Sequence, residues 1–202
     1  MAKPAGSACN LDCAYCFYLS KRVLPGGPGS GHMPDEVLER FVKDYIDSIT
    51  ADEVVFSWQG GEPTLLGLGF FEKVVALQKK HARAGQRIEN DLQTNGTLLD
   101  DDWARFLKQH RFLVGLSIDG PREIHDHCRI TKHAEPTFDQ VFAAAKMLQK
   151  HGVRFNTLTC VHRYNASRPL DVYRFLRREI GSTYIQFIPI VEIRGFENMA
   201  PG

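Results

Sequence analysis

Apolar residues recur along the chain at two spacings, which predict helices and strands in alternation. In residues 34–49 and 68–83 they recur every three or four positions, as on one face of an amphipathic helix. These faces consist of Val37, Leu38, Phe41, Val42, Tyr45, Ile46 and Ile49 in the first segment, and of Phe70, Phe71, Val74, Val75 and Leu77 in the second. Residues 53–58, between them, form a short apolar run typical of a buried strand.

The alternation continues along the rest of the sequence. Further strands are predicted at 87–95, 112–119, 153–161 and 183–190, and further helices at 100–109, 137–152 and 169–181. Thr137 and Gln140 have the spacing of a capping box, and residues 1–4 are expected to form the stub of a first strand. Repeated βα units predict an α/β fold with a parallel sheet. Five strands are too few for a closed eight-stranded barrel, so an open or partial barrel is expected.

Polar or glycine-bearing segments lie at or just after the ends of four of the predicted strands. They are residues 59–63 (QGGEP), 94–96 (TNG), 117–120 (SIDG) and 186–189 (QFIP). A pair of glycines after a strand is by itself most often a tight turn. The carboxyl ends of parallel strands, however, meet at one edge of the sheet, where α/β proteins place their binding sites. Four such segments at one edge favour a site there.

Three cysteines stand close together near the N-terminus, in the stretch SACNLDCAYCFYL. Cys9, Cys13 and Cys16 have the spacing C-x3-C-x2-C and lie among aromatic residues. A structural zinc site requires four ligands, usually in two separated pairs. Cysteine thiolates also bind iron–sulfur clusters, and three of them would leave one iron of a four-iron cluster open. The spacing alone leaves a three-cysteine cluster, a zinc site and unrelated thiols as alternatives.

Composition and charge exclude several classes of protein. The net charge of +1 gives no electrostatic reason to expect a nucleic acid or an anionic membrane as partner. The first residues lack the apolar core of a signal peptide, and no apolar run approaches the length of a membrane span. Five cysteines, three of them clustered, fit a secreted disulfide framework poorly and a cytoplasmic protein with metal-binding thiols better.

The cysteine triplet, followed by Phe17 and by GGEP after the next strand, resembles the signature of the radical S-adenosylmethionine (SAM) enzymes. The segments MPDEVLERFVKDYI, FSWQGGEPTLLG, LSIDGPREIHD, LQKHGVRFN and IQFIPIVE further resemble the anaerobic sulfatase-maturating enzymes, in order and over nearly the whole chain. The resemblance implies a partial (β/α)6 TIM-like barrel that holds one [4Fe-4S] cluster, with SAM bound to its open iron. The implied reaction is reductive cleavage of SAM to a 5′-deoxyadenosyl radical, which oxidises a cysteine or serine of an unfolded sulfatase segment to formylglycine.

Roles for individual residues are likewise implied by the resemblance. Cys9, Cys13 and Cys16 would bind the cluster. The residues implied for SAM are Tyr15, Gly60, Gly61, Glu62, Ser117, Arg129 and Ile190, with the Gly60–Glu62 backbone receiving the amino group and Arg129 the carboxylate. Tyr18 and Gln59 would contact the peptide substrate. Flavodoxin or ferredoxin would supply the electron.

Several of these residues also have a simpler interpretation. An arginine on a loop is ordinarily a solvated charge, so only its place in HDHCR singles out Arg129, and Ser117 could merely end a strand. His125 and Asp126 are expected to serve local structure, and Trp58 and Trp103 to pack in the core or at its rim. The remaining cysteines, Cys128 and Cys160, are expected to be buried or partly buried free thiols.

The chain is shorter than the family it resembles. Members of that family carry a C-terminal SPASM domain, with two auxiliary clusters and an aspartate base, and that domain is absent here. We therefore expect residues 1–202 to be the radical SAM core domain alone, with its cluster loop at 5–20 and its first strand clipped. No catalytic base is assigned within it. The alternatives are a related SPASM-type maturase with another peptide substrate, and a non-catalytic iron–sulfur-binding fragment.

Overall fold

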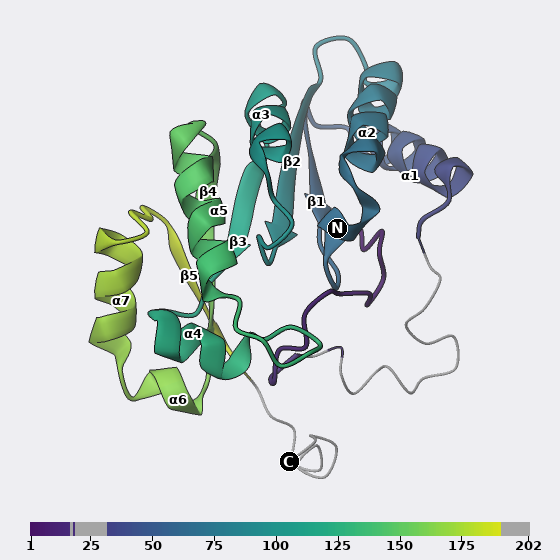
Figure 1. Cartoon of the computed structure of the whole chain (residues 1–202). Coiled ribbons are helices and arrows are strands. Elements are labelled where there is room, and N and C mark those ends of the chain that lie inside the picture. The colour runs from purple at the N-terminus through teal and green to yellow at the C-terminus, as the bar shows by residue number, and fades with distance from the viewer. Residues whose placement is uncertain (17, 19–31, 191–202) are drawn as a thin grey trace.

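The computed structural model describes residues 1–16, 18 and 32–190, and in this part of the chain helices and strands alternate as predicted (Figure 1). The strands are β1 (Glu53–Trp58), β2 (Arg87–Thr94), β3 (Leu113–Ser117), β4 (Arg154–Val161) and β5 (Ile185–Pro189). The helices are α1 (Asp35–Ser48), η2 (Pro63–Leu66), α2 (Leu68–His81), α3 (Asp101–Gln109), α4 (Arg122–Cys128), α5 (Phe138–Lys150), α6 (Arg163–Ala166) and α7 (Pro169–Arg178).

The five strands form one parallel sheet whose spatial order is the order of the sequence. Each strand is joined to the next through a helical segment. The carboxyl ends of all five strands therefore lie at the same edge of the sheet. The sheet is open and curled, with the helices along its outer face (Figure 1). This confirms the expected partial α/β barrel. The stub expected at residues 1–4 is reduced to one parallel bridge between Ala2 and Trp58.

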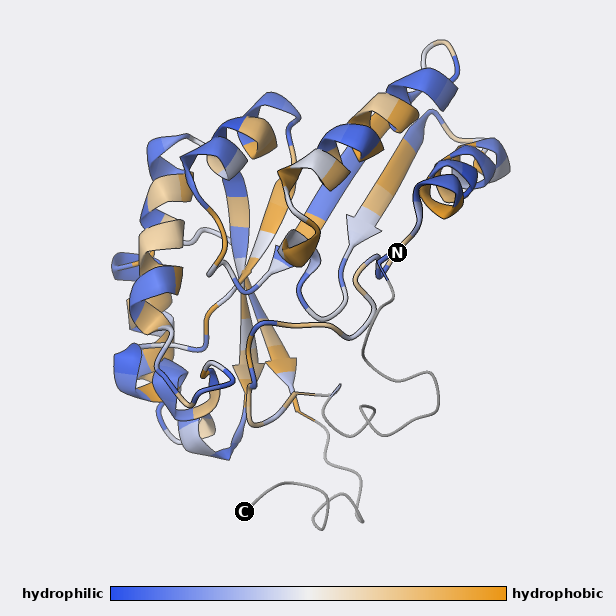
Figure 2. Ribbon diagram, turned by 45° about the vertical axis from the view of Figure 1, so that its right-hand side comes forward, coloured by the Kyte–Doolittle hydropathy of each residue, from blue (hydrophilic) through white to orange (hydrophobic). Residues whose placement is uncertain are grey.

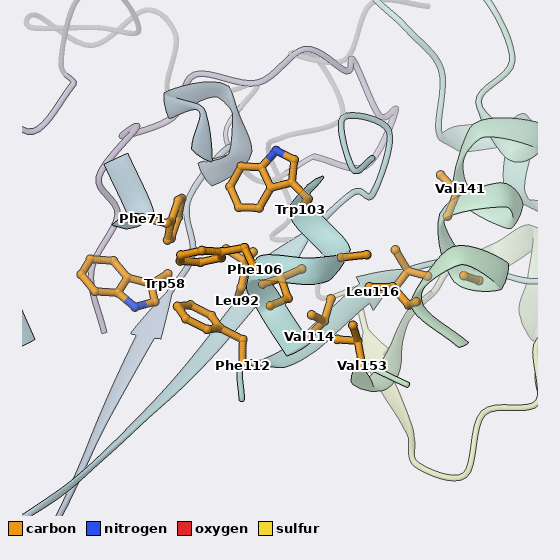
Figure 3. Packing of buried hydrophobic residues seen from close by; sticks show 14 of the residues in the cluster. Trp58, Phe71, Leu92, Trp103, Phe106, Phe112, Val114, Leu116, Val141 and Val153 are labelled. Carbon is orange, nitrogen blue, oxygen red and sulfur yellow. The ribbon is translucent and has the colours of Figure 1, made fainter. Parts of the chain in front are cut away.

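The core lies between the sheet and its helices and is rich in aromatic side chains. Trp58, Phe71 and Phe112 are almost fully buried there and pack against Trp103 and Phe106 (Figure 3). Apolar residues follow the inner stripes of the helices and the strands, whereas the outer helical faces are polar (Figure 2). Such burial of large rings supplies the main favourable term in folding. The prediction that both tryptophans pack in the protein is confirmed.

The polar residue Asn90 of β2 is buried, and hydrogen bonds accommodate it there. Asn90, in β2, accepts a hydrogen bond from Trp58 Nε1 at 2.8 Å and exchanges two with the Gln78 side chain of α2, at 2.8 and 2.9 Å. Because all these groups are buried, each needs a partner in the protein. The amides satisfy one another and the indole, so the polar Asn90 fits the helix-covered face of the sheet.

Two local predictions are wrong. Val37 was expected on the inward face of α1 but is 47% exposed, because the buried stripe of that helix runs through Leu38, Val42 and Ile46. The Thr137–Gln140 capping box does not form: the Thr137 hydroxyl donates to the Arg129 carbonyl at 2.7 Å instead.

Asp126 takes over the capping of α5. Its Oδ1 accepts the backbone N–H groups of Thr137 and Phe138, both at 2.9 Å. The expectation that Asp126 serves local structure is thereby confirmed. No helix in the described ranges is both long and apolar enough to cross a membrane.

Candidate functional site

The cysteine-bearing segment lies across the carboxyl edge of the sheet, where the strands of Figure 1 end. The segment after β1 holds it from one side. Gly61 N–H donates to the Gly6 carbonyl at 2.9 Å, and Glu62 N–H donates to the Ala8 carbonyl at 2.8 Å. Gly61 has to be glycine for this approach, because a Cβ atom there would lie 2.0 Å from the Ala8 oxygen. The paired glycines are therefore more than a turn, since they bring two backbone segments into contact.

The segment after α4 holds the cysteine-bearing stretch from the other side. Asp12 N–H donates to the Ile130 carbonyl at 2.9 Å, and Ala14 N–H donates to the Cys128 carbonyl at 2.8 Å. Leu11 and Thr131 form an antiparallel bridge between the same two segments. The stretch that contains Cys9, Cys13 and Cys16 is thus fixed by backbone hydrogen bonds to two chain segments that are distant in sequence.

The glutamate of the GGEP motif serves as an internal hydrogen-bond acceptor. Glu62 is fully buried, and its Oε1 accepts from the Thr64 backbone and hydroxyl and from the Thr94 hydroxyl, at 3.1, 2.7 and 2.8 Å. Its Oε2 accepts from Asn95 N–H at 2.7 Å. Burial raises the pKa of Glu62, and the four donors act in the opposite direction. The carboxylate joins the exits of β1 and β2, so any ligand of this motif would meet its backbone rather than this side chain.

Asn95, at the exit of β2, touches the first cysteine. Its amide Nδ2 lies 3.8 Å from Cys9 Sγ and donates to Asn10 Oδ1 at 2.9 Å, while Leu11 N–H lies 3.4 Å from the same sulfur. Burial raises the pKa of Cys9 to about 11, and it also raises the pKa of Cys13. Both thiols are therefore protonated at neutral pH, and a bound metal would have to displace their protons.

Tyr15, Arg129 and Asp119 form a partly buried hydrogen-bonded chain between the cysteine segment and the end of β3. Arg129 Nη1 donates to the Tyr15 hydroxyl at 2.7 Å, and that hydroxyl donates to Asp119 Oδ2. Asp119 Oδ1 accepts Cys160 N–H at 3.0 Å, which ties the chain to β4. Arg129 is only 7% exposed, so the interpretation of it as a solvated charge is wrong.

The guanidinium of Arg129 keeps donors free for a ligand, because only its Nη1 has a hydrogen-bond partner among the described residues. Its Nε is buried and has no hydrogen-bond partner among the described residues. An unsatisfied donor on a buried cation is costly in a folded protein. A negatively charged ligand group at this point would satisfy both the donor and the charge, and a carboxylate suits a guanidinium in shape.

Comparison with known proteins identifies the family. The sequence model of the Radical SAM superfamily matches residues 4–176. The chain belongs to the radical SAM superfamily.

Individual radical SAM proteins resemble this chain closely along most of its length. It is 48% identical over 95% of its residues to a serine-type anaerobic sulfatase-maturating enzyme of Bacteroides thetaiotaomicron, and 45% identical over 98% to a cysteine-type enzyme of Clostridium perfringens. It covers 46% and 54% of these two relatives, respectively, so it spans about half their length.

Solved structures show the same likeness. The structure described as "Native anSMEcpe with bound AdoMet and Kp18Cys peptide" superposes on 96% of this chain with a TM-score of 0.87 and 44% identity, and the match covers 52% of that structure's chain. SuiB of Streptococcus suis, at 16% identity and a TM-score of 0.70, shares the fold.

The residues at the edge of this radical SAM chain fit a four-iron cluster better than a single metal ion. Within the described ranges, no three side chains of the His, Cys, Asp and Glu types are placed to hold one ion. Three cysteines that each bind a different iron of a cluster need not converge on one point. Cys9 and Cys16 are partly exposed and Cys13 is buried, and all three thiols are free. The donor set and its spacing thus suit a [4Fe-4S] cluster.

The structure places the other predicted residues along the same edge. Ser117 ends β3, Gln59 N–H donates to the Ala2 carbonyl at 2.9 Å, and Ile190 N–H donates to the Val161 carbonyl at 3.1 Å. Tyr18 lies with its ring 5.2 Å from Lys3 Nζ. Phe17, residues 19–20 of the predicted cluster loop and the last two residues of IQFIPIVE lie outside the described residues.

The structure adds site residues that the sequence did not single out. Asp119 and Asn95 lie within segments recognised as strand exits, but their side-chain contacts depend on chain segments far away in sequence. His162, directly after β4, stacks on Tyr15 with ring centroids 5.7 Å apart. Its position at a strand end was the only available signal. His125 is buried and accepts Asp119 N–H at 3.5 Å, and Cys128 and Cys160 are free thiols, as predicted for all three.

Proposed function

We propose that this chain is the radical SAM core of an anaerobic sulfatase-maturating enzyme, which oxidises a cysteine or serine in an unfolded sulfatase segment to formylglycine. The observation that carries the proposal is the fixed cysteine segment. Cys9, Cys13 and Cys16 lie on a stretch bound on one side by the Gly61 and Glu62 backbone and on the other by residues 128–131. Identity of 45–48% to sulfatase-maturating enzymes over nearly the whole chain supports this choice of reaction.

Each residue of the site has a proposed role. The three cysteines would bind the cluster, which together with SAM supplies one-electron reductive cleavage of SAM to a 5′-deoxyadenosyl radical. The N–H groups of Gly61 and Glu62 are engaged with the cysteine segment. The carbonyl oxygens of the Gly60–Glu62 backbone are therefore the groups that would accept from the amino group of SAM.

The remaining contacts to SAM and to the substrate follow the strand exits. Arg129 would bind the SAM carboxylate through its free Nε. The adenosine would be surrounded by Ser117 at the end of β3, Tyr15 within the cysteine segment and Ile190 directly after β5. Tyr18 and Gln59 are proposed to contact the peptide.

The wider organisation is proposed on the same basis. Residues 1–202 form one core domain with its cluster loop at 5–20, and no SPASM domain lies within them. The partners are a sulfatase peptide and a reduced flavodoxin or ferredoxin, in the cytoplasm. A peptide partner is supported by the peptide-bound structure to which this chain is similar.

The test is anaerobic turnover by the gene product that contains this chain, after cluster reconstitution. Two peptides that differ only in a cysteine or serine at the target position are incubated with SAM and a strong reductant, and are analysed by mass spectrometry. The proposal predicts an aldehyde at the target residue of at least one peptide, together with 5′-deoxyadenosine. Formation of 5′-deoxyadenosine with both peptides unchanged would contradict sulfatase maturation and favour another peptide substrate.

A further inference from the structure

Asp119 lies at the centre of the site without a role in the proposed reaction. It is fully buried at the exit of β3, and one carboxylate oxygen accepts Cys160 N–H at 3.0 Å. The other oxygen accepts the Tyr15 hydroxyl. The Asp119 backbone is also held, because its N–H donates to His125 Nδ1 at 3.5 Å and its carbonyl accepts from Asn165 Nδ2 at 3.4 Å. The carboxylate therefore has one fixed position.

The hydrogen bonds run in one direction from the cation to the anion. Arg129 Nη1 donates to Tyr15, and Tyr15 donates to Asp119. A guanidinium can only donate, and a carboxylate that receives a hydroxyl and a backbone N–H is well matched by its ionised form. The tyrosine hydroxyl thus links two opposite charges that do not touch each other directly.

This arrangement determines which edge of the guanidinium faces a ligand. With Nη1 held by Tyr15, Nη2 and the buried, unpartnered Nε are left available. A buried arginine without such a tether could turn its planar donor group among several orientations, each with a different set of free N–H groups. Asp119, acting through Tyr15, limits this turning.

We propose that Asp119 is a positioning residue for SAM: acting through the Tyr15 hydroxyl, it orients Arg129 for the SAM carboxylate and couples that orientation to the cluster loop. The inference rests on the proposed SAM-binding role of this edge. Because Tyr15 stands between Cys13 and Cys16, the same chain links the cluster ligands to the carboxylate-binding group. The orientation of SAM would then depend on the conformation of this stretch.

The test compares Asp119→Asn with Asp126→Asn in the anaerobically reconstituted chain. Asparagine keeps an oxygen for Cys160 N–H but removes the charge and the second acceptor. Asp126 is a matched control, because its oxygen likewise accepts backbone N–H groups three residues from Arg129 in sequence. SAM binding is followed by the change that SAM causes in the EPR spectrum of the reduced cluster, as a function of SAM concentration.

Asp119→Asn is expected to raise the SAM concentration for half-maximal change about tenfold or more, as loss of one oriented charge-assisted contact would. Iron content should stay equal to that of the unmodified chain, and Asp126→Asn should shift the midpoint less than about twofold. Tyr15→Phe should raise the SAM midpoint as much as Asp119→Asn does. The double variant should bind SAM no more weakly than either single variant, because both changes break the same chain of hydrogen bonds.

Two results would overturn the inference. One is a SAM midpoint in Asp119→Asn equal to that of the unmodified chain. The other is loss of iron uptake in both Asp119→Asn and Tyr15→Phe, which would make Asp119 a support of the loop rather than of SAM. If the unmodified chain itself takes up iron but shows no spectral response to SAM, the proposed function fails instead.

Discussion

Single buried residues at the sheet edge carry much of its stability, and Glu62 is the clearest case. Its carboxylate accepts four hydrogen bonds inside the protein. In Glu62→Gln an amide N–H₂ replaces one acceptor and faces a donor, so we expect the free energy of unfolding to fall by about 1–3 kcal/mol. The exposed Glu72 on α2 offers a control. Glu72→Gln should change the free energy of unfolding by less than about 0.5 kcal/mol. Denaturant unfolding measures both, and equal stabilities would contradict this role.

His125 gives a pH dependence with a definite sign. Burial lowers its pKa well below the ordinary 6.5, and the nearby Arg129 acts in the same direction, so the folded chain keeps the ring neutral. The ring can then donate through Nε2 to Thr137, 3.1 Å away, while Nδ1 accepts Asp119 N–H. The unfolded chain takes up a proton as the pH falls through about 6.5. The contribution of His125 to stability is therefore present above that pH and lost below it.

The size of this effect follows from proton linkage. As the pH falls from 6.5 towards the lower pKa of His125 in the folded state, this residue should decrease the free energy of unfolding by up to about 1.4 kcal/mol per pH unit. His125→Gln removes the titration and should flatten the decrease between pH 7.5 and 5.5, measured by denaturant unfolding. An identical pH dependence in the two proteins would show that His125 is not neutral in the fold.

At the scale of elements, the contact between the β1 exit and the cysteine segment depends on the absence of a side chain. In Gly61→Ala the new methyl group would lie 2.0 Å from the Ala8 carbonyl oxygen, so the segment has to move. We expect a lower melting temperature and less iron per chain after reconstitution. Gly69, in α2, has no atom within 4 Å of the corresponding position. The Gly69→Ala variant should bind as much iron as the unmodified chain, and its free energy of unfolding should rise by up to about 1 kcal/mol. Equal iron contents in the two variants would refute the close contact.

All five strands and the longer helices α1, α2, α3, α5 and α7 were predicted within a few residues. Burial of one face imposes a pattern on most of these elements. The short helices η2, α4 and α6 were not, since four to seven residues are too few to show a period. Thr137 misled for a related reason: a capping box is a local pattern, whereas its hydroxyl binds the distant Arg129 carbonyl.

For the candidate site, the location could be predicted from the sequence but the side-chain contacts could not. The cysteine spacing and the strand exits located it, because parallel strands end at one edge. The side-chain partners were not predictable, since Tyr15, Asp119 and Arg129 meet only after three segments fold together. The burial of Arg129 shows this well. Its surroundings in the sequence are polar, and only the return of residues 128–131 onto the cysteine segment covers it.

At the scale of the whole molecule, the cysteine segment joins the β1 side of the sheet to the β3 side. A cluster bound to three residues of that segment would fix it further, so reconstitution should stabilise the entire chain rather than the segment alone. We expect the reconstituted chain to melt at a higher temperature than the metal-free chain, under anaerobic conditions. Cys13→Ala, treated identically, should show no such shift. A shift of the same size in that variant would mean that iron binds elsewhere.

We propose that the cysteines and strand ends at this edge hold a cluster that cleaves SAM. The most direct measurement is the amount of 5′-deoxyadenosine formed from SAM by the anaerobically reconstituted chain with a strong reductant, beside Cys13→Ala prepared in the same way. We expect product with the unmodified chain and none above background with Cys13→Ala. If the unmodified chain, with iron and sulfide bound, formed no more 5′-deoxyadenosine than the variant, these residues would not hold a SAM-cleaving cluster.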